Sequence, residues 1–315
     1  MDLAVNSNSP IYYYLMGGAV LWMVAFSLLR VEAKEVEIVK FDTSRVWLLN
    51  GDVTITTENV NILAPRGIYY EDKEMGFLMD TVVFSTDSTL IVSDTLWYQE
   101  EGRFRFVNFA SVTQPGRFLG SHSMEVVGDS VYLSGPLFVS LYKNGAAFCG
   151  DTGIFDLKEH RGKIWENAGA TLQRAESLHV NADTFYFFGD TLWAIGDVNV
   201  NTSKFEARGD TFFLLPGERE YGVIWGSTHI KSKSELIDAL SLSFYVEKGK
   251  ISLLTASGDV TIESKSEEGM TVLKSGYAEF SIGQEGELES LSAFSGVSGN
   301  YVKKGSEESD VGPEG

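Results

Sequence analysis

The stretch Gly189-Asp-Thr-Leu-Trp-Ala-Ile-Gly-Asp-Val-Asn-Val200 decides the fold of this chain. Between its two Gly-Asp pairs, apolar and polar residues alternate, and a period of two is the pattern of a β-strand with one buried face. Glycine adopts the positive φ of a tight turn, and aspartate can bond to the backbone just downstream of itself. This stretch and its continuation Phe205-Glu-Ala-Arg-Gly-Asp-Thr-Phe-Phe-Leu214 therefore predict short strands separated by Gly-Asp turns.

The same pattern recurs along the chain. Asp-Thr followed by apolar or aromatic residues begins at Asp80, Asp94, Asp151 and Asp183, and Asp129-Ser is a near copy. One apolar strand centre per unit gives a mean spacing of about 30 residues, with centres at Val53, Val82, Val112, Leu137, Leu172, Val198, Ile230 and Val260. A repeat of this length usually forms a stack in which each unit buries its apolar face against its neighbours.

The body between residues 35 and 302 is predicted to be all-β. Strands of about five to eight residues follow one another, and only residues 166–176 and 234–240 have any helical character. Strands without helices between them exclude a parallel βαβ architecture. We therefore expect an elongated, repeat-built β-jellyroll or open β-roll, and 315 residues leave room for two tandem halves.

A membrane anchor is predicted at residues 11–29, after a short N-terminal segment of residues 1–10. These 19 residues are uncharged and mostly apolar, and as a helix they would span about 28 Å, close to the hydrocarbon thickness of a bilayer. Tyr12, Tyr13, Tyr14 and Trp22 are typical of interfacial anchors. A cleaved signal ending near Val31-Glu-Ala33, which would leave a soluble periplasmic protein, is the alternative.

The orientation of the anchor and the last residues follow from charge. Arg30, Lys34, Lys40 and Arg45 all follow the apolar segment, so a literal positive-inside count keeps the body in the cytoplasm. That rule weakens for a long translocated domain, so we assign the compartment from the fold of the body and not from this charge count. Residues 303–315 have no apolar pattern and are predicted to be a disordered tail.

Composition excludes several classes of partner. The net charge of −19 leaves no basic stripe for nucleic acid and opposes docking on an anionic membrane surface. The single Cys149 excludes an internal disulfide and is predicted to be a small buried apolar residue. The four histidines are scattered without ligand-like spacing, so we expect no metal site and no cofactor.

No catalytic residues are predicted. The chain has no Ser/His/Asp set, no phosphate-binding glycine loop after a strand and no zinc spacing. Glu71-Asp72 and Glu100-Glu101 fall in predicted hairpin turns, where charge usually serves solvation. Calcium-binding β-roll repeats need a regular short period, which the irregular Asp-Thr intervals lack. A β-helix enzyme acting on polysaccharide would need carboxylates that converge in a cleft.

Two pairs of segments carry a family resemblance. Val46-Trp-Leu-Leu-Asn-Gly-Asp-Val-Thr-Ile55 precedes Ala64-Pro-Arg-Gly-Ile-Tyr-Tyr70, and Leu254-Thr-Ala-Ser-Gly-Asp-Val-Thr-Ile262 precedes Ser275-Gly-Tyr-Ala-Glu-Phe280. With the predicted anchor, this layout resembles the OstA-like periplasmic proteins of lipopolysaccharide transport (the LptA/LptC group), over about residues 35–300. The longer body and the absence of basic residues before the anchor depart from the LptC pattern.

The resemblance implies a non-enzymatic protein of the inner membrane with its body in the periplasm. Such a protein binds lipopolysaccharide, or a similar multi-acyl glycolipid, in an apolar trough and passes it from an inner-membrane transporter complex toward the outer membrane. The candidate groove residues are Val53, Ile55, Val82, Phe84, Val198, Val200, Val260 and Ile262. The alternative is a membrane-anchored structural scaffold in which the same residues fill a dry core.

The last strands are candidates for edge-to-edge pairing with other β-jellyroll proteins. A strand at the edge of a sheet exposes unpaired backbone groups that invite another chain. The C-terminal stretch from Leu291 to Val302 is apolar at intervals and ends at Lys303-Lys304. The expected contact residues are Leu291, Phe294, Val297 and Tyr301.

Overall fold

The computed structural model describes residues 30–41, 44–56, 59–73, 75–99, 103–142, 145–173, 177–189, 191–217, 219–247, 250–282 and 288–303. Across these ranges every element is a β-strand except one short 3₁₀-helix, η1 (Glu71–Lys73). No helix within these ranges is long and apolar enough to span a membrane. The predicted anchor at residues 11–29 and residues 304–315 of the predicted tail lie outside the described residues.

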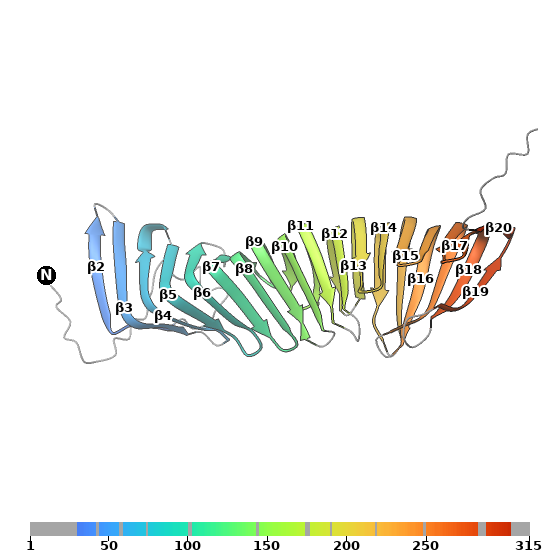
Figure 1. Cartoon of the computed structure of the whole chain (residues 1–315). Helices are drawn as coiled ribbons and strands as arrows, with labels where there is room; N and C mark the ends of the chain where they lie inside the picture. Colours follow the sequence, from blue (N-terminus) through green and yellow to red (C-terminus); the bar gives the residue numbers. More distant parts are fainter. Residues whose placement is uncertain are drawn as a thin grey trace, which may run out of the picture. The chain divides into compact units, whose positions relative to one another are not determined.

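The chain divides into two compact units. Figure 1 labels the strands in chain order. Unit 1 comprises the described residues within Met1–Lys143 and Ala147–Ile164, and unit 2 those within Asn144–Ala146 and Trp165–Gly315. The strands up to β10 are β1 (Arg30–Glu32), β2 (Glu35–Phe41), β3 (Ser44–Thr56), β4 (Asn61–Tyr70), β5 (Met75–Ser85), β6 (Leu90–Gln99), β7 (Arg103–Gln114), β8 (Arg117–Val127), β9 (Ser130–Leu141) and β10 (Ala146–Asp156). The strands from β11 are β11 (Arg161–Leu172), β12 (Leu178–Phe188), β13 (Thr191–Asn201), β14 (Phe205–Leu215), β15 (Arg219–Ser232), β16 (Glu235–Glu247), β17 (Lys250–Lys265), β18 (Gly269–Ile282), β19 (Leu288–Phe294) and β20 (Ser298–Lys303).

Within each unit the strands form an antiparallel meander. From β3 to β9 and from β12 to β18, each strand pairs with the next one along the chain. This confirms the all-β prediction. Of the two windows with helical character, residues 166–172 lie in β11 and residues 235–240 lie at the start of β16, whereas residues 174–176 are outside the described residues.

The Gly-Asp pairs inside the long strands are not hairpin turns, and this part of the prediction is wrong. Gly51-Asp52, Gly196-Asp197 and Gly258-Asp259 lie in the middle of β3, β13 and β17 and have positive φ. The pairing register shifts at each of them, which is the mark of a β-bulge. A bulge bends the strand. The sequence pattern predicts two short strands with a turn between them, whereas the structure has one long strand that bends at the bulge, and we name this bend a corner.

The corners recur at a regular interval of about 30 residues. Left-handed residues occupy the same central place in every second strand, at Asp80-Thr81, Asn108-Phe109, Gly135, Glu166-Asn167 and Gly226-Ser227 as well as at the three Gly-Asp pairs. The repeat of about 30 residues is therefore a pair of long strands, one of which carries a left-handed corner. The predicted strand lengths were too short for the same reason.

Each corner divides its strand into two arms. We name arm A the half that contains, for example, residues 44–50 of β3 and 191–195 of β13, and arm B the half that contains residues 53–56 and 198–201. In unit 1 the two arms fold onto each other, because the Phe84 ring of arm B lies 5.6 Å from Phe104 and 5.8 Å from Phe106 of arm A. The buried residues of both arms therefore share one interior.

Both terminal edges are strands interrupted at a corner. β1 and β2 pair with the two arms of β3, and β19 and β20 pair with the two arms of β18. Lys34 stands between β1 and β2, where its N–H donates to the Gly51 carbonyl over 2.9 Å. Ser295 and Gly296 stand between β19 and β20 and have positive φ.

Two smaller predictions are also corrected. Cys149 is exposed, because the neighbouring Phe148 and Gly150 take the buried positions of β10 and leave position 149 on the opposite face. Residue 303, assigned to the tail, is the last residue of β20 and pairs with Gly269. Glu71-Asp72 lies in η1 between β4 and β5, as expected for a connection, whereas residues 100–101 are outside the described residues.

Candidate functional site

The eight predicted groove residues all lie on arm B. In unit 1, Val53 and Val82 are 1 % and 0 % exposed, and Phe84 is 8 % exposed. In unit 2, Val198, Val200 and Val260 are each 1 % exposed and Ile262 is 4 % exposed. Ile55 alone is only partly buried. The residues chosen from the sequence therefore face the interior of their unit.

Cross-strand pairing brings these residues into continuous rows. In unit 1 a row of directly opposed residues runs Ile55, Ile62, Phe84, Ile91, Val112 and Leu119. In unit 2 the matching row runs Val180, Val200, Ala207, Ile230, Ile237, Ile262 and Leu273. Each row supplies one wall of an apolar interior that extends from strand to strand.

Sequence reasoning missed the opposite wall, which arm A supplies. In unit 2 it is a row of buried, directly opposed residues, Phe185, Ala194, Phe212, Ile224, Leu242, Ala256 and Ala278. The signal was present, since these residues also alternate with polar ones. It was overlooked because the bent strand was divided at its Gly-Asp corner.

The row of arm B next to the corner in unit 1 is built mostly of small residues. Next to the corner in unit 1, the opposed pairs are Val53 with Ala64, Val82 with Ser93, and Ala110 with Ser121. One row further out, Phe84 and Leu119 replace these small residues. Leu137, which is directly opposite Ser121 and 4 % exposed, is the large exception in the row next to the corner.

Buried hydroxyls in the corner rows bond to the bent backbone. Ser93 Oγ donates to the Thr95 carbonyl over 3.1 Å, and Thr228 Oγ1 donates to the Ala239 carbonyl over 2.8 Å. Ser121 Oγ donates to the Ser123 and Ser134 carbonyls, and Ser275 Oγ is the buried side-chain atom of the described residues that has no partner. A bulge leaves ladder carbonyls unpaired, and the hydroxyls of Ser93, Ser121 and Thr228 satisfy such carbonyls without opening the interior to water.

Arg117 closes the interior of unit 1 at the free ends of the two arms. It begins β8 on arm B, is only 6 % exposed, and its Nη2 donates to the carbonyl of Leu157, which follows arm A of β10. Its Nε donates to Gln114 Oε1 over 2.5 Å, and Gln114 Nε2 donates to Thr89 Oγ1 over 2.6 Å. Burial lowers the pKa of the guanidinium, whereas the charge of Asp156 raises it. We name this link the Arg117 clasp.

The clasp could not have been found from the sequence. Arg117 follows a Gln114-Pro-Gly turn, where a charged residue is usually solvated. Its acceptor lies 40 residues further along the chain. Only the folding of arm A onto arm B brings the two together.

The C-terminal edge is apolar and exposed. The four predicted contact residues Leu291, Phe294, Val297 and Tyr301 are 38 %, 48 %, 52 % and 55 % exposed. Leu291 is directly opposite the buried Phe280, so it belongs to the inward face, whereas Phe294 packs against Tyr277 on the outward face. At the other end of the chain, Ile38 of β2 is 51 % exposed. Apolar residues of each terminal strand are thus left uncovered.

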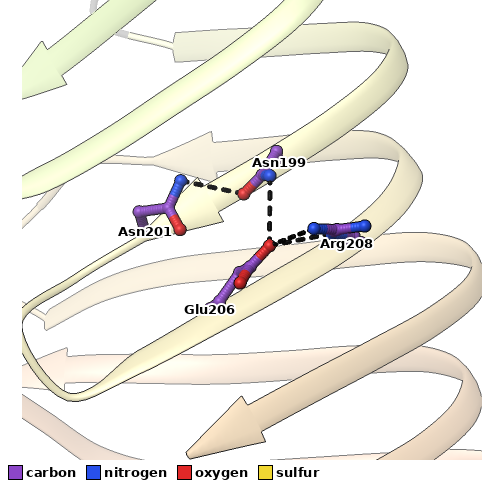
Figure 2. A network of polar contacts seen from close by, with 4 residues as sticks. All are labelled: Asn199, Asn201, Glu206 and Arg208. Carbon is purple, nitrogen blue, oxygen red and sulfur yellow. Dashed lines mark hydrogen bonds and ion pairs between the residues drawn. The ribbon is translucent and has the colours of Figure 1, made fainter.

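The outer face of arm B in unit 2 is polar and charged. Figure 2 shows Glu206 of β14 accepting hydrogen bonds from Arg208 Nε and Nη2 over 2.8 and 2.6 Å and from Asn199 Nδ2 over 3.3 Å. Asn201 Nδ2 extends this network to Asn199 Oδ1 over 2.9 Å. The hydrogen bond from Arg208, and then its charge, lower the pKa of Glu206. These contacts lie on a solvated face and contribute little to stability.

The outer face of arm A in unit 2 is different, because its two central rows carry no charge from β12 to β17. One row of directly opposed residues runs Tyr186, Trp193, Phe213, Val223, Ser243 and Thr255. This row then reaches Glu279 of β18, which is directly opposite Thr255. The neighbouring row runs Thr184, Ile195, Thr211, Trp225, Ser241 and Ser257. We name these two rows the neutral face.

Comparison of the sequence with models of known protein families and with curated proteins finds no match to this chain. Within the described ranges, no group of three or more His, Cys, Asp or Glu side chains is placed to hold a metal ion. The described residues offer apolar interiors, exposed terminal edges and two outer faces.

Proposed function

We propose that this chain is a non-enzymatic lipid-binding protein of lipopolysaccharide export. The acyl chains of lipopolysaccharide, or of a similar glycolipid, lie in the apolar interior between arms A and B, and like β-domains dock on the terminal edges. The observation that carries the proposal is an apolar interior that runs up to the β19–β20 edge, where no further strand pairs within the described residues. There the inward-facing Leu291 is 38 % exposed, although its neighbour Phe280 is 2 % exposed.

The two terminal edges are of matching types, which supports end-to-end docking. β19 and β20 carry a left-handed corner at Ser295-Gly296, as β3 does at Gly51-Asp52. In β3 that type of corner pairs with the β1–β2 edge. The β1–β2 edge of a second domain could therefore pair with β19–β20, because these strands carry the same type of corner as its usual partner β3.

The Arg117 clasp gives the proposal an entry point in unit 1. Lipid enters between the free ends of the arms, and that is where Arg117 joins β8 to the backbone after β10. Arg117 makes this contact through its side chain, so its release does not require a strand to unfold.

A structural scaffold with a dry core is the second candidate. Exposures of 0 % at Val82 and 1 % at Val200 favour it, because they mean that water does not reach these positions in the closed interior. The two candidates differ in whether the interior ever takes up an amphiphile.

A photo-crosslinking residue at Val200 or at Val297, tested in living cells, distinguishes the two candidates. We expect capture of a multi-acyl lipid at both positions and none at Tyr132, which is 44 % exposed and lies on the outer face of unit 1. Capture of neighbouring protein alone at Val200 and Val297 would establish the scaffold instead.

Val200→Asp gives an independent measurement. Burying a polar group in a dry core costs roughly 1–3 kcal/mol, and less where water can enter. A lipid-binding interior predicts a folded variant that no longer retains lipid on purification. A variant that fails to fold, together with wild-type protein that carries no lipid, would contradict the proposal.

A further inference from the structure

The neutral face is unusual for this protein. The chain has a net charge of −19, and 22 % of its residues are charged. The opposite outer face of the same strands, on arm B, contains Glu206, Arg208, Lys231 and Asp238 in neighbouring positions. A sheet face that only meets solvent would resemble the arm B face. The absence of charge from both rows of the neutral face therefore indicates a surface that contacts something else.

Half of the neutral face is an aromatic platform. Trp193 and Phe213 lie directly opposite each other with ring centroids 4.6 Å apart. The rings of Trp193 and Trp225 are nearly parallel, at 18°, with centroids 6.1 Å apart. Trp225 is 37 % exposed, and the other two rings are half-buried against the sheet. Phe213 is tilted by 59° to Trp193 and by 41° to Trp225, so the three rings pack against one another as one cluster on the sheet.

The other half is a ladder of hydroxyl groups on β16 and β17. Ser241 Oγ lies 2.7 Å from Ser257 Oγ, and Ser243 Oγ hydrogen-bonds to Thr255 Oγ1 over 2.5 Å. Each hydroxyl can both donate and accept, so members of the ladder keep lone pairs or protons for a ligand. Trp225 is directly opposite Ser241, which makes the platform and the ladder continuous.

We propose that the neutral face of unit 2 binds an uncharged polysaccharide chain. A sugar ring presents polarised C–H groups on its flat face, which the negative face of an aromatic ring attracts, and hydroxyl groups at its edge, which the ladder can bond. An uncharged ligand also suits an uncharged surface on an acidic protein, which would repel an anionic polymer. The inference does not depend on the lipid-export proposal, which concerns the interior and the edges.

The half-burial of Trp193 and Phe213 selects the polysaccharide over a lipid surface. Aromatic residues anchor a protein at a membrane when their rings extend into the interfacial region. Trp193 and Phe213 pack against each other with their rings tilted by 59° and are half-buried, so they cannot extend in this way. A polysaccharide lies across the platform without insertion.

The test is calorimetric titration of the full chain, purified in a detergent without a sugar headgroup. The probes are cellohexaose, laminarihexaose, maltohexaose and N-acetylated chitohexaose. We expect at least one to bind, and Trp225→Ala to weaken that binding about tenfold, which corresponds to about 1.4 kcal/mol. Trp225→Phe, which keeps a ring, should lose less. Trp97→Ala is the matched control, since Trp97 is 36 % exposed on the outer face of unit 1 and lies opposite the charged Arg105.

Three results would overturn the inference. One is that none of the four oligosaccharides binds, and another is that Trp97→Ala weakens binding as much as Trp225→Ala. The third is that the wild-type chain, but not Trp225→Ala, floats with phosphatidylcholine vesicles while no oligosaccharide binds, which would assign the face to a membrane. Trp225→Phe keeps the test valid if Trp225→Ala does not fold, and lipid retained in the interior reports separately on the export proposal.

Discussion

Replacing Arg117 by methionine tests the clasp. Methionine keeps the apolar stem but removes the guanidinium, and with it the bonds to the Leu157 carbonyl and to Gln114 Oε1. Hydrogen bonds to a charged group contribute about 1.5–3 kcal/mol each. The lowered pKa of Arg117 shows that burial acts against the charge, so part of that gain is offset. We expect a net loss of about 1–3 kcal/mol in the local stability of unit 1.

Hydrogen exchange measures that loss where it occurs. The Leu157 N–H donates to the Asp129 carbonyl over 2.8 Å, so its exchange reports whether the end of β10 opens. A loss of 1.4 kcal/mol would speed this exchange about tenfold. Arg105→Met is the control, because Arg105 is exposed on the outer face and should leave the Leu157 amide unchanged. Arg117→Met could instead slow the exchange or leave it unaltered. The desolvation of the buried guanidinium would then offset the free energy of its hydrogen bonds, and the clasp would not hold the arms together.

Three further predictions concern packing and charge. Gly222→Ala should destabilise unit 2 by about 1–3 kcal/mol, because a Cβ there would collide with the Phe244 ring, which is 5 % exposed and stacked on Phe212. Gly76→Ala should instead stabilise unit 1 by about 0.4–1 kcal/mol, because the nearest atom to its new Cβ would be 3.7 Å away. Chemical denaturation measures both changes in unfolding free energy. Phe106→Ala should lower the free energy of unfolding by about 3–5 kcal/mol, because Phe106 is 0 % exposed between the two arms. A smaller decrease would show that the interior collapses or is already filled by lipid. The pKa of Asp156 is lowered by a hydrogen bond from the N–H of Glu159, and then by the N–H of Lys158 and the side chain of Arg161. Asp156 therefore stabilises the fold fully above the ordinary carboxyl pKa range, and this stabilisation is lost as the pH falls below about 4. The melting temperature of Asp156→Asn should fall less steeply with decreasing pH than that of the wild type, and equal slopes would contradict this assignment.

Much of the architecture was predictable from local patterns. Alternation in segments such as Thr191–Asn201 identified strands, and the spacing of about 30 residues identified the repeating pair of strands. The corners were misread because glycine and aspartate adopt positive φ both in hairpin turns and in bulges. Local sequence does not distinguish the two, since the difference is whether the neighbouring strand continues past the bend.

The candidate sites were only half visible for the same reason. Val200 was found because it follows a Gly-Asp pair, whereas Phe212, which faces the same interior from arm A, was not. Arg117 and the neutral face depend on register and on distant partners. Trp193 and Trp225 lie 32 positions apart in the sequence, and two strand pairings bring their rings together.

The alternation of corner types has a consequence for how such a chain can change in length. A left-handed corner occurs in every second strand, and its partner strand bends without one. Removing one strand of the meander would place two corners of the same type side by side and reverse the direction of everything downstream. Removing two consecutive strands restores both the corner type and the direction. The chain can therefore lose or gain strands only in consecutive pairs. We expect excision of β13 and β14 together to leave a foldable sheet, whereas excision of β13 alone will not.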